Sequence, residues 1–124
     1  MTKVIIIEDE KPAARLLQRK LQKLDITAGT MLHSVQEAVE WFSNNEHPDL
    51  IFLDIQLSDG LSFEIFDRVH ITSAVIFTTA YSEHAVQSFE LDAVDYLLKP
   101  FSLARFIKAC NKANEIYTLR GSST

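Results

Sequence analysis

The sequence predicts an α/β fold in which a five-stranded parallel sheet carries helices on both faces. Short continuous apolar runs alternate with longer stretches of helical spacing, as expected for strands buried on both faces between amphipathic helices. The chain has 124 residues, of which 47% are hydrophobic, and this is the size and core material of one domain. Strict alternation of strand and helix also implies right-handed crossovers.

The first two strand and helix pairs have clear boundaries. Residues 4–7 form an apolar run, and Pro12 after it favours the first turn of a helix. The inner stripe of that helix is Ala14, Leu17, Leu21 and Leu24. The second strand is expected near residues 26–32. Its helix begins at Ser34, and Glu37 three residues later completes the pattern of a capping box.

The other three pairs follow the same pattern, with strands at residues 50–53, 74–77 and 94–98. A short helix is expected around Phe63, Phe66 and Val69, and another from Ser82. The last helix has Ser102 as its N-cap and is expected to end near Gly121. Its inner stripe is Leu103, Phe106, Ile107, Cys110, Ala113 and Tyr117.

Composition narrows the classes of function. The chain has 12 Lys and Arg against 17 Asp and Glu, for a net charge of -5, and it lacks the clustered cations of a nucleic-acid clamp. The single Cys110 cannot form an internal disulfide and the first residues do not resemble a signal peptide, so a cytoplasmic location is expected. No apolar stretch approaches the ~20 residues that cross a bilayer, so we expect no membrane partner.

Polar side chains gather where the predicted strands end, which is where ligands bind in open parallel sheets. These residues are Glu8, Asp9, Asp54, Thr78, Thr79 and Lys99. Crowded carboxylates suit a hard divalent cation, of which Mg²⁺ is the natural candidate. With the metal and Lys99 supplying positive charge and Thr79 a hydrogen bond, Asp54 is a candidate nucleophile that would form an acyl phosphate.

Four segments in this order resemble the receiver domain of two-component response regulators over nearly the whole chain: IIIEDE, LIFLDIQ, VIFTTAY and DYLLKPF. The combination of DIQLSDG and DYLLKPF resembles receivers of the LytTR (LytR/AlgR) group. The resemblance implies a flavodoxin-like, doubly wound (βα)5 sheet. It also implies a single receiver domain over residues 1–120, with residues 121–124 as a flexible tail or the start of a linker.

The resemblance implies a metal site built around the phosphoacceptor, Asp54. Asp9 would be a direct Mg²⁺ ligand, and Glu8 would act on the ion largely through water. The backbone carbonyl of Gln56 would be a third protein ligand.

The resemblance also implies a switch and its partners. A sensor histidine kinase would donate the phosphoryl group, Lys99 would hold it, Thr79 would follow it, and Tyr96 would report the change at the surface. The bond before Pro100 would be cis. Phosphorylation would promote a homodimer through the fourth helix, fifth strand and fifth helix. DNA would be bound only by a C-terminal LytTR output domain that is absent from these residues.

Some features leave alternatives open. The loop after Asp54 lacks the proline common in the family, because Ser58 and Asp59 lead directly to Gly60, and a bulky Tyr81 would slow self-dephosphorylation. Glu8, Asp9 and Lys99 are each consistent with ordinary surface charges. The alternative function is a haloacid-dehalogenase-like phosphatase that uses Asp54 as its nucleophile, although Gln56 stands where such enzymes carry a general acid. A degenerate receiver and a nucleotide-binding domain are weaker alternatives.

Overall fold

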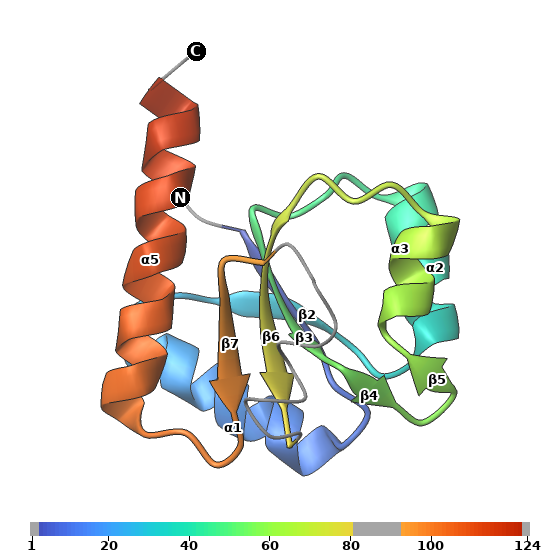
Figure 1. The fold of residues 1–124 in the computed structure, drawn as a ribbon, viewed down its shortest axis with the longest axis horizontal. Coiled ribbons are helices and arrows are strands. Elements are labelled where there is room, and N and C mark those ends of the chain that lie inside the picture. Colours follow the sequence, from blue (N-terminus) through green and yellow to red (C-terminus); the bar gives the residue numbers. More distant parts are fainter. Residues whose placement is uncertain (1–2, 81–92, 123–124) are drawn as a thin grey trace.

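The computed structural model describes residues 3–80 and 93–122, and it has the predicted parallel sheet with helices on both faces (Figure 1). The strands, in the order β2-β1-β3-β6-β7, are β1 (Val4–Ile7), β2 (Ala28–Leu32), β3 (Leu50–Asp54), β6 (Ala74–Thr79) and β7 (Asp95–Leu98). The helices are α1 (Lys11–Gln22), α2 (Val35–Asn44), α3 (Phe63–Arg68) and α5 (Leu103–Ser122). Strand order reverses between β1 and β3, so a ligand crevice is expected at their carboxyl ends.

Each face of the sheet has its own hydrophobic core, because successive strand residues point to opposite faces. Ile6 and Phe52 belong to the core that α1 and α5 cover, with Phe106 among its fully buried side chains. Ile5 and Ile51 belong to the core under α2 and α3. The continuous apolar runs of β1, β3 and β6 therefore have the two-faced burial that the sequence predicts.

Helix α1 begins as predicted, with Pro12 in its first turn, but it ends earlier than the apolar stripe suggested. Asp25 adopts φ 59°, and the N–H of Ile26 donates to the carbonyl oxygen of Leu21 at 3.0 Å. A left-handed residue at this place terminates a helix. The placement of Leu24 on the helical stripe is therefore wrong; it packs against the core from the turn.

Half of the capping box predicted for α2 is present. The Ser34 hydroxyl accepts the Glu37 N–H at 3.0 Å. The Glu37 carboxylate, however, accepts from the N–H of His33 at 3.2 Å rather than from that of Ser34. The helix start is therefore confirmed, whereas the reciprocal bond of the box is shifted by one residue.

Helix α5 has the predicted N-cap, because the Ser102 hydroxyl accepts the N–H of Arg105 at 3.1 Å. One expectation was wrong, because Leu103 lies in the first turn and is 42% exposed. The helix runs to Ser122, one residue beyond Gly121, so the expected end near Gly121 is confirmed. The Tyr117 side chain lies outside the described part of the chain, and the domain boundary at residue 120 stays a prediction.

A two-stranded hairpin that the sequence did not predict follows β3. It pairs β4 (Gln56–Leu57) with β5 (Gly60–Leu61), with only Ser58 and Asp59 between them. It directly precedes α3, where Ile65 is fully buried and Phe63, Phe66 and Val69 pack against the core.

The helix predicted from Ser82, together with Tyr81, lies outside the described residues. Within residues 3–80 and 93–122, no helix has both the length and the apolar character needed to cross a bilayer.

Candidate functional site

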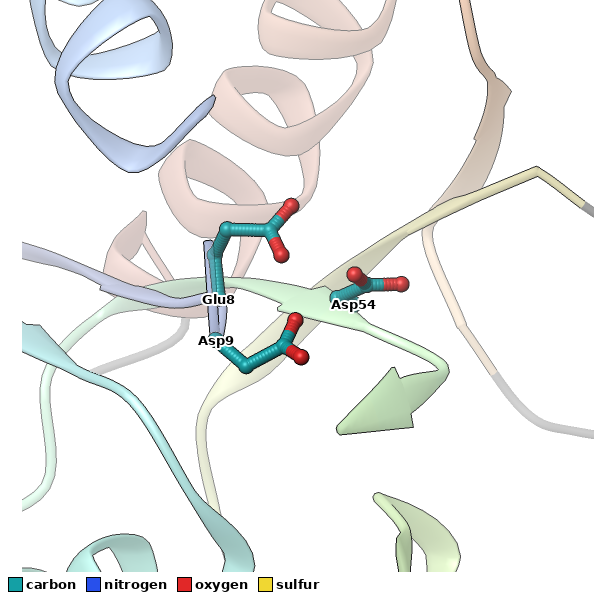
Figure 2. A group of neighbouring side chains, drawn as sticks. All are labelled: Glu8, Asp9 and Asp54. Carbon is teal, nitrogen blue, oxygen red and sulfur yellow. The ribbon is translucent and has the colours of Figure 1, made fainter. Parts of the chain in front are cut away.

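Three carboxyl groups meet at the carboxyl ends of β1 and β3. Glu8 and Asp9 directly follow β1, and Asp54 is the last residue of β3. One oxygen from each lies within 4.8 Å of the others, and Figure 2 shows the three side chains gathered at this edge of the sheet. Glu8 and Asp54 are buried, whereas Asp9 is partly exposed. The predicted convergence of these acids is confirmed.

Lys99 supplies the positive charge that this acidic cluster needs. Its ammonium lies 2.5 Å from Glu8 Oε1 and 3.1 Å from Asp54 Oδ2. The Lys99 N–H donates to the Thr79 carbonyl oxygen at 2.7 Å, next to the predicted cis bond to Pro100, which is confirmed. The lysine therefore joins two strand ends that are far apart in sequence.

The protonation of these groups reflects burial and crowding. Burial raises the pKa of Glu8, and Asp54 raises it further, against the opposing hydrogen bond from Lys99. The pKa of Asp9 is raised by burial and then by its contact with Glu8. Burial alone would lower the pKa of Lys99, but its hydrogen bond to Glu8 and the charge of Asp54 outweigh that effect and raise it. Burial and the repulsion between neighbouring acids together therefore outweigh what Lys99 compensates.

This repulsion should make the metal-free protein more stable when one acid is neutralised. A carboxyl whose folded pKa is raised destabilises the fold as pH rises through that pKa, and the loss is absent below the ordinary carboxyl range. Asp9→Asn should therefore raise the free energy of unfolding by about 1 kcal/mol at neutral pH, roughly the repulsion of two charges ~4 Å apart in a watery setting. The gain should shrink as pH falls.

Urea denaturation of the metal-free protein and the variant across this pH range would measure the effect. Asp67→Asn, an exposed acid on α3, is the matched control and should show no comparable gain. Equal stability of Asp9→Asn and the unmodified chain at neutral pH would contradict the proposed repulsion.

Both threonines of the predicted site are buried residues of β6 rather than loop residues, because this strand is longer than predicted. Thr78 is paired in register with Asp54 and lines a pocket of about 210 Å³ together with Glu8 and Lys99. Thr79 is the last residue of β6 and is paired with Leu98. The role predicted for Thr79 in following a phosphoryl group stays a prediction.

Gln56 lies at the start of the hairpin, two residues after Asp54. Its N–H donates to Asp54 Oδ1 at 3.4 Å, and its side-chain amide donates to the Leu57 carbonyl oxygen at 3.1 Å. Both its backbone N–H and its side-chain amide therefore donate hydrogen bonds to neighbouring residues of the chain. The metal-binding role of its backbone carbonyl stays a prediction.

The predicted switch aromatic, Tyr96, is partly buried on β7. Its ring stacks on that of Phe77, with centroids 5.7 Å apart and planes at 12°. The backbone of this strand is also held from α5, because Arg105 donates to the Tyr96 carbonyl oxygen at 3.1 Å and pairs with both carboxylate oxygens of Asp95. A turn of the Tyr96 side chain would therefore give up its stacking on Phe77.

Sequence reasoning missed two contacts near the site. The Asp59 carboxylate accepts the N–H groups of Val35 and Gln36, and His33 Nδ1 lies 2.8 Å from the Glu8 carbonyl oxygen. The pattern Asp-Gly at residues 59–60 indicates a turn, but nothing local in the sequence tells that this turn reaches a helix more than twenty residues earlier.

The arrangement is suited to one kind of chemistry. Clustered carboxylate oxygens are the ligands that Mg²⁺ prefers, and the residues present fit that ion. An ammonium within hydrogen-bond distance of Asp54 can neutralise charge that develops beside this carboxylate. Cys110 takes no part, because it is buried on α5 and burial raises the pKa of its thiol to about 11.

Comparison with known proteins agrees with this picture. The family model for the response regulator receiver domain matches residues 4–111. Sensory transduction protein LytT of Bacillus anthracis is 38% identical over 116 residues, which cover 90% of this chain and 47% of that protein. Transcriptional regulatory protein LytR of Staphylococcus aureus (strain N315) is 37% identical over 114 residues, covering 89% of this chain and 46% of that protein. The chain spans about half the length of the curated relatives it matches.

Solved structures show the same fold. The response regulatory domain of mrkE from Klebsiella pneumoniae superposes with a TM-score of 0.77 at 33% identity, covering 94% of this chain and 98% of that one. The receiver domain of PhyR from Erythrobacter litoralis gives a TM-score of 0.72 at 27% identity, with coverage of 90% and 88%.

Proposed function

Because the chain belongs to the response regulator receiver domain family, we propose that it works as a switch in which a sensor histidine kinase phosphorylates Asp54. The observation that carries this proposal is the ammonium of Lys99 between two of the three clustered acids, 3.1 Å from Asp54 Oδ2. A receiver is a signalling switch rather than a typical enzyme, and we expect at most slow self-dephosphorylation here.

Mg²⁺ would be held by the carboxylates of Asp9 and Asp54 and by the backbone carbonyl of Gln56, with Glu8 acting largely through water. When bound, the ion supplies charge neutralisation for the incoming phosphoryl oxygens. The acids support this assignment because their oxygens are close together and the pKa of Glu8 is raised by burial and then by Asp54, so a cation would relieve the repulsion between these carboxylates.

The transfer itself would form one bond and break one. An oxygen of the Asp54 carboxylate attacks phosphorus, the bond between phosphorus and the donor histidine nitrogen breaks, and its electron pair stays on that nitrogen. Lys99 would then neutralise the phosphoryl oxygens. The Thr79 hydroxyl would donate a hydrogen bond to them.

Phosphorylation would act by shifting an equilibrium between two surfaces. Movement of Thr79 towards the phosphoryl group would allow the Tyr96 ring to leave Phe77, its stacking partner in the described structure. The changed surface of the fourth helix, fifth strand and fifth helix would then form a homodimer. The fourth helix lies outside the described residues.

The relatives suggest what the switch controls. The chain covers only about half of LytT and LytR, and we propose that the complete protein is a cytoplasmic transcription regulator with a C-terminal LytTR domain that binds DNA. The phosphatase alternative is not favoured, because the chain belongs to the receiver family and Gln56 occupies the place of the general acid.

The proposal is tested by intact-protein mass after incubation with Mg²⁺ and acetyl phosphate. The unmodified chain should gain one phosphoryl group, and Asp54→Ala should gain none because the attacking oxygen is missing. Asp67→Ala removes an exposed acid of α3 and should still be phosphorylated.

Three outcomes would count against the proposal. Labelling of Asp54→Ala would mean that another residue accepts the phosphoryl group, and undiminished labelling in EDTA would exclude the metal role. Rapid consumption of acetyl phosphate without a labelled protein would favour the phosphatase.

A further inference from the structure

The turn between β4 and β5 is fastened to the first turn of α2. Asp59 Oδ1 accepts the N–H of Val35 at 2.8 Å, and Oδ2 accepts the N–H of Gln36 at 3.0 Å. The first N–H groups of a helix have no partner within the helix. One carboxylate from a distant loop therefore satisfies two of them, while Ser34 satisfies a third through Glu37.

The charge of Asp59 suits this position. A helix N-terminus carries partial positive charge, which favours an anion. Burial alone would raise the pKa of Asp59, but the hydrogen bonds from Val35 and Gln36 outweigh it and lower the pKa. The carboxylate is therefore ionised at neutral pH and accepts both N–H groups at once.

The two ends of the hairpin are joined to each other and to β6, the strand beside the one that carries Asp54. The N–H of Ile55 donates to the Thr78 carbonyl oxygen at 3.1 Å, and the N–H of Ser62 donates to the Ile55 carbonyl oxygen at 2.9 Å. The hairpin turn has two residues only, so Asp59 lies three positions from Gln56. Where Asp59 is held, the backbone of Gln56 has little freedom to move.

The same helix terminus is tied to the acids after β1. His33 precedes Ser34, and its Nδ1 lies 2.8 Å from the carbonyl oxygen of Glu8. The N–H of Glu8 donates to the Leu32 carbonyl oxygen at 2.9 Å. The N-terminus of α2 is thus a common support for the two chain segments that carry the acidic cluster.

From these contacts we propose that Asp59 is a positioning residue: by holding the hairpin against α2, it sets the backbone of Gln56 relative to Asp54 and so tunes the affinity for Mg²⁺. This inference rests on the proposed function of the acidic site. It also explains how the loop keeps its place without the proline common in the family, because a side chain anchors the turn.

The test measures the Mg²⁺ dissociation constant of three variants by isothermal titration calorimetry. Asp59→Ala should raise the constant about 10-fold, the lower end of the effect of losing a residue that supports metal ligands. Ser34→Ala removes a cap at the same helix terminus without touching the hairpin, so it should lower the thermal midpoint but leave the Mg²⁺ constant unchanged. Asp67→Ala removes one negative charge elsewhere and should change neither.

A second readout needs no metal. In the metal-free protein, hydrogen exchange at the amides of Gln56 and Ser62 should be faster in Asp59→Ala than in the unmodified chain. Ser34→Ala should leave these two rates unchanged, which separates a loosened hairpin from a weakened helix. If Asp59→Ala does not fold, Asp59→Asn carries the test, because one acceptor oxygen remains and an intermediate loss of Mg²⁺ affinity is expected.

The outcomes separate this inference from the proposed function. If the unmodified chain binds no Mg²⁺, the proposed function fails. If it binds Mg²⁺ and Asp59→Ala binds equally well, with unchanged exchange at Gln56 and Ser62, only the role of Asp59 fails. Loss of the 10-fold difference in ~1 M salt, where the screening length is about 3 Å, would show that Asp59 acts by charge alone and would also overturn the inference.

Discussion

Lys99→Met should destabilise the metal-free protein and at the same time strengthen Mg²⁺ binding. Removing the ammonium leaves the Glu8 carboxylate, whose side chain is only 5% exposed, without its cation. Breaking a fully buried ion pair costs ~3–5 kcal/mol. We expect about 2 kcal/mol here, because 31% of the Lys99 side chain is exposed and solvent screens the interaction.

Lys99→Met is expected to lower stability but to raise the affinity for Mg²⁺, and this pair of opposite effects makes the prediction specific. Without the ammonium, the acids attract a divalent ion more strongly, so the Mg²⁺ dissociation constant should fall. Acceptance of the phosphoryl group should still drop by about 100-fold, the usual effect of removing one charge-stabilising donor. Urea denaturation in EDTA, calorimetric titration and mass spectrometry measure the three quantities.

Lys108→Met is the matched control for this substitution, because Lys108 is exposed on α5 and should affect none of the three. The destabilisation by Lys99→Met should also shrink at low pH, since Glu8 then becomes protonated and needs no cation. A variant with weaker Mg²⁺ binding than the unmodified chain would contradict the proposed charge balance.

Phe106→Ala should cause a large loss of stability, about 3–5 kcal/mol. Phe106 is fully buried, and its ring stacks on those of Phe52 and Phe101, with centroids 5.6 and 6.0 Å away. Truncation leaves a cavity between α5 and the sheet. The thermal midpoint should fall by roughly 10–20 °C for a domain of this size.

Leu103→Ala in the same helix is the control, because Leu103 is 42% exposed and surface substitutions of this kind usually change stability by about 0.5 kcal/mol or less. Differential scanning calorimetry of both variants would measure the contrast. Similar midpoints for the two would mean that α5 contributes little to the core.

The fold and the convergence of Asp54 and Lys99 could be predicted because both follow from regular chain geometry. Runs such as residues 4–7 are apolar throughout only when both faces of a strand are buried, and parallel strands bring their ends to one edge. The same reasoning places Glu8 and Asp9 next to Asp54.

The errors concern features that depend on contacts between distant segments. Leu24 fits the helical period of α1. The helix nevertheless ends before Leu24, because the backbone of Asp25 adopts a left-handed conformation. The hairpin after β3 and the contact of Asp59 with α2 depend on residues brought together only by the fold.

The length of α5 has a mechanical consequence. Its 20 residues make a rod about 30 Å long, and Figure 1 shows its C-terminal turns extending beyond the edge of the sheet. Arg105 in its first turns is bound to Asp95 and to the Tyr96 carbonyl oxygen on β7. A tilt of α5 about these contacts would therefore move its C-terminal end, by ~0.5 Å for each degree of tilt.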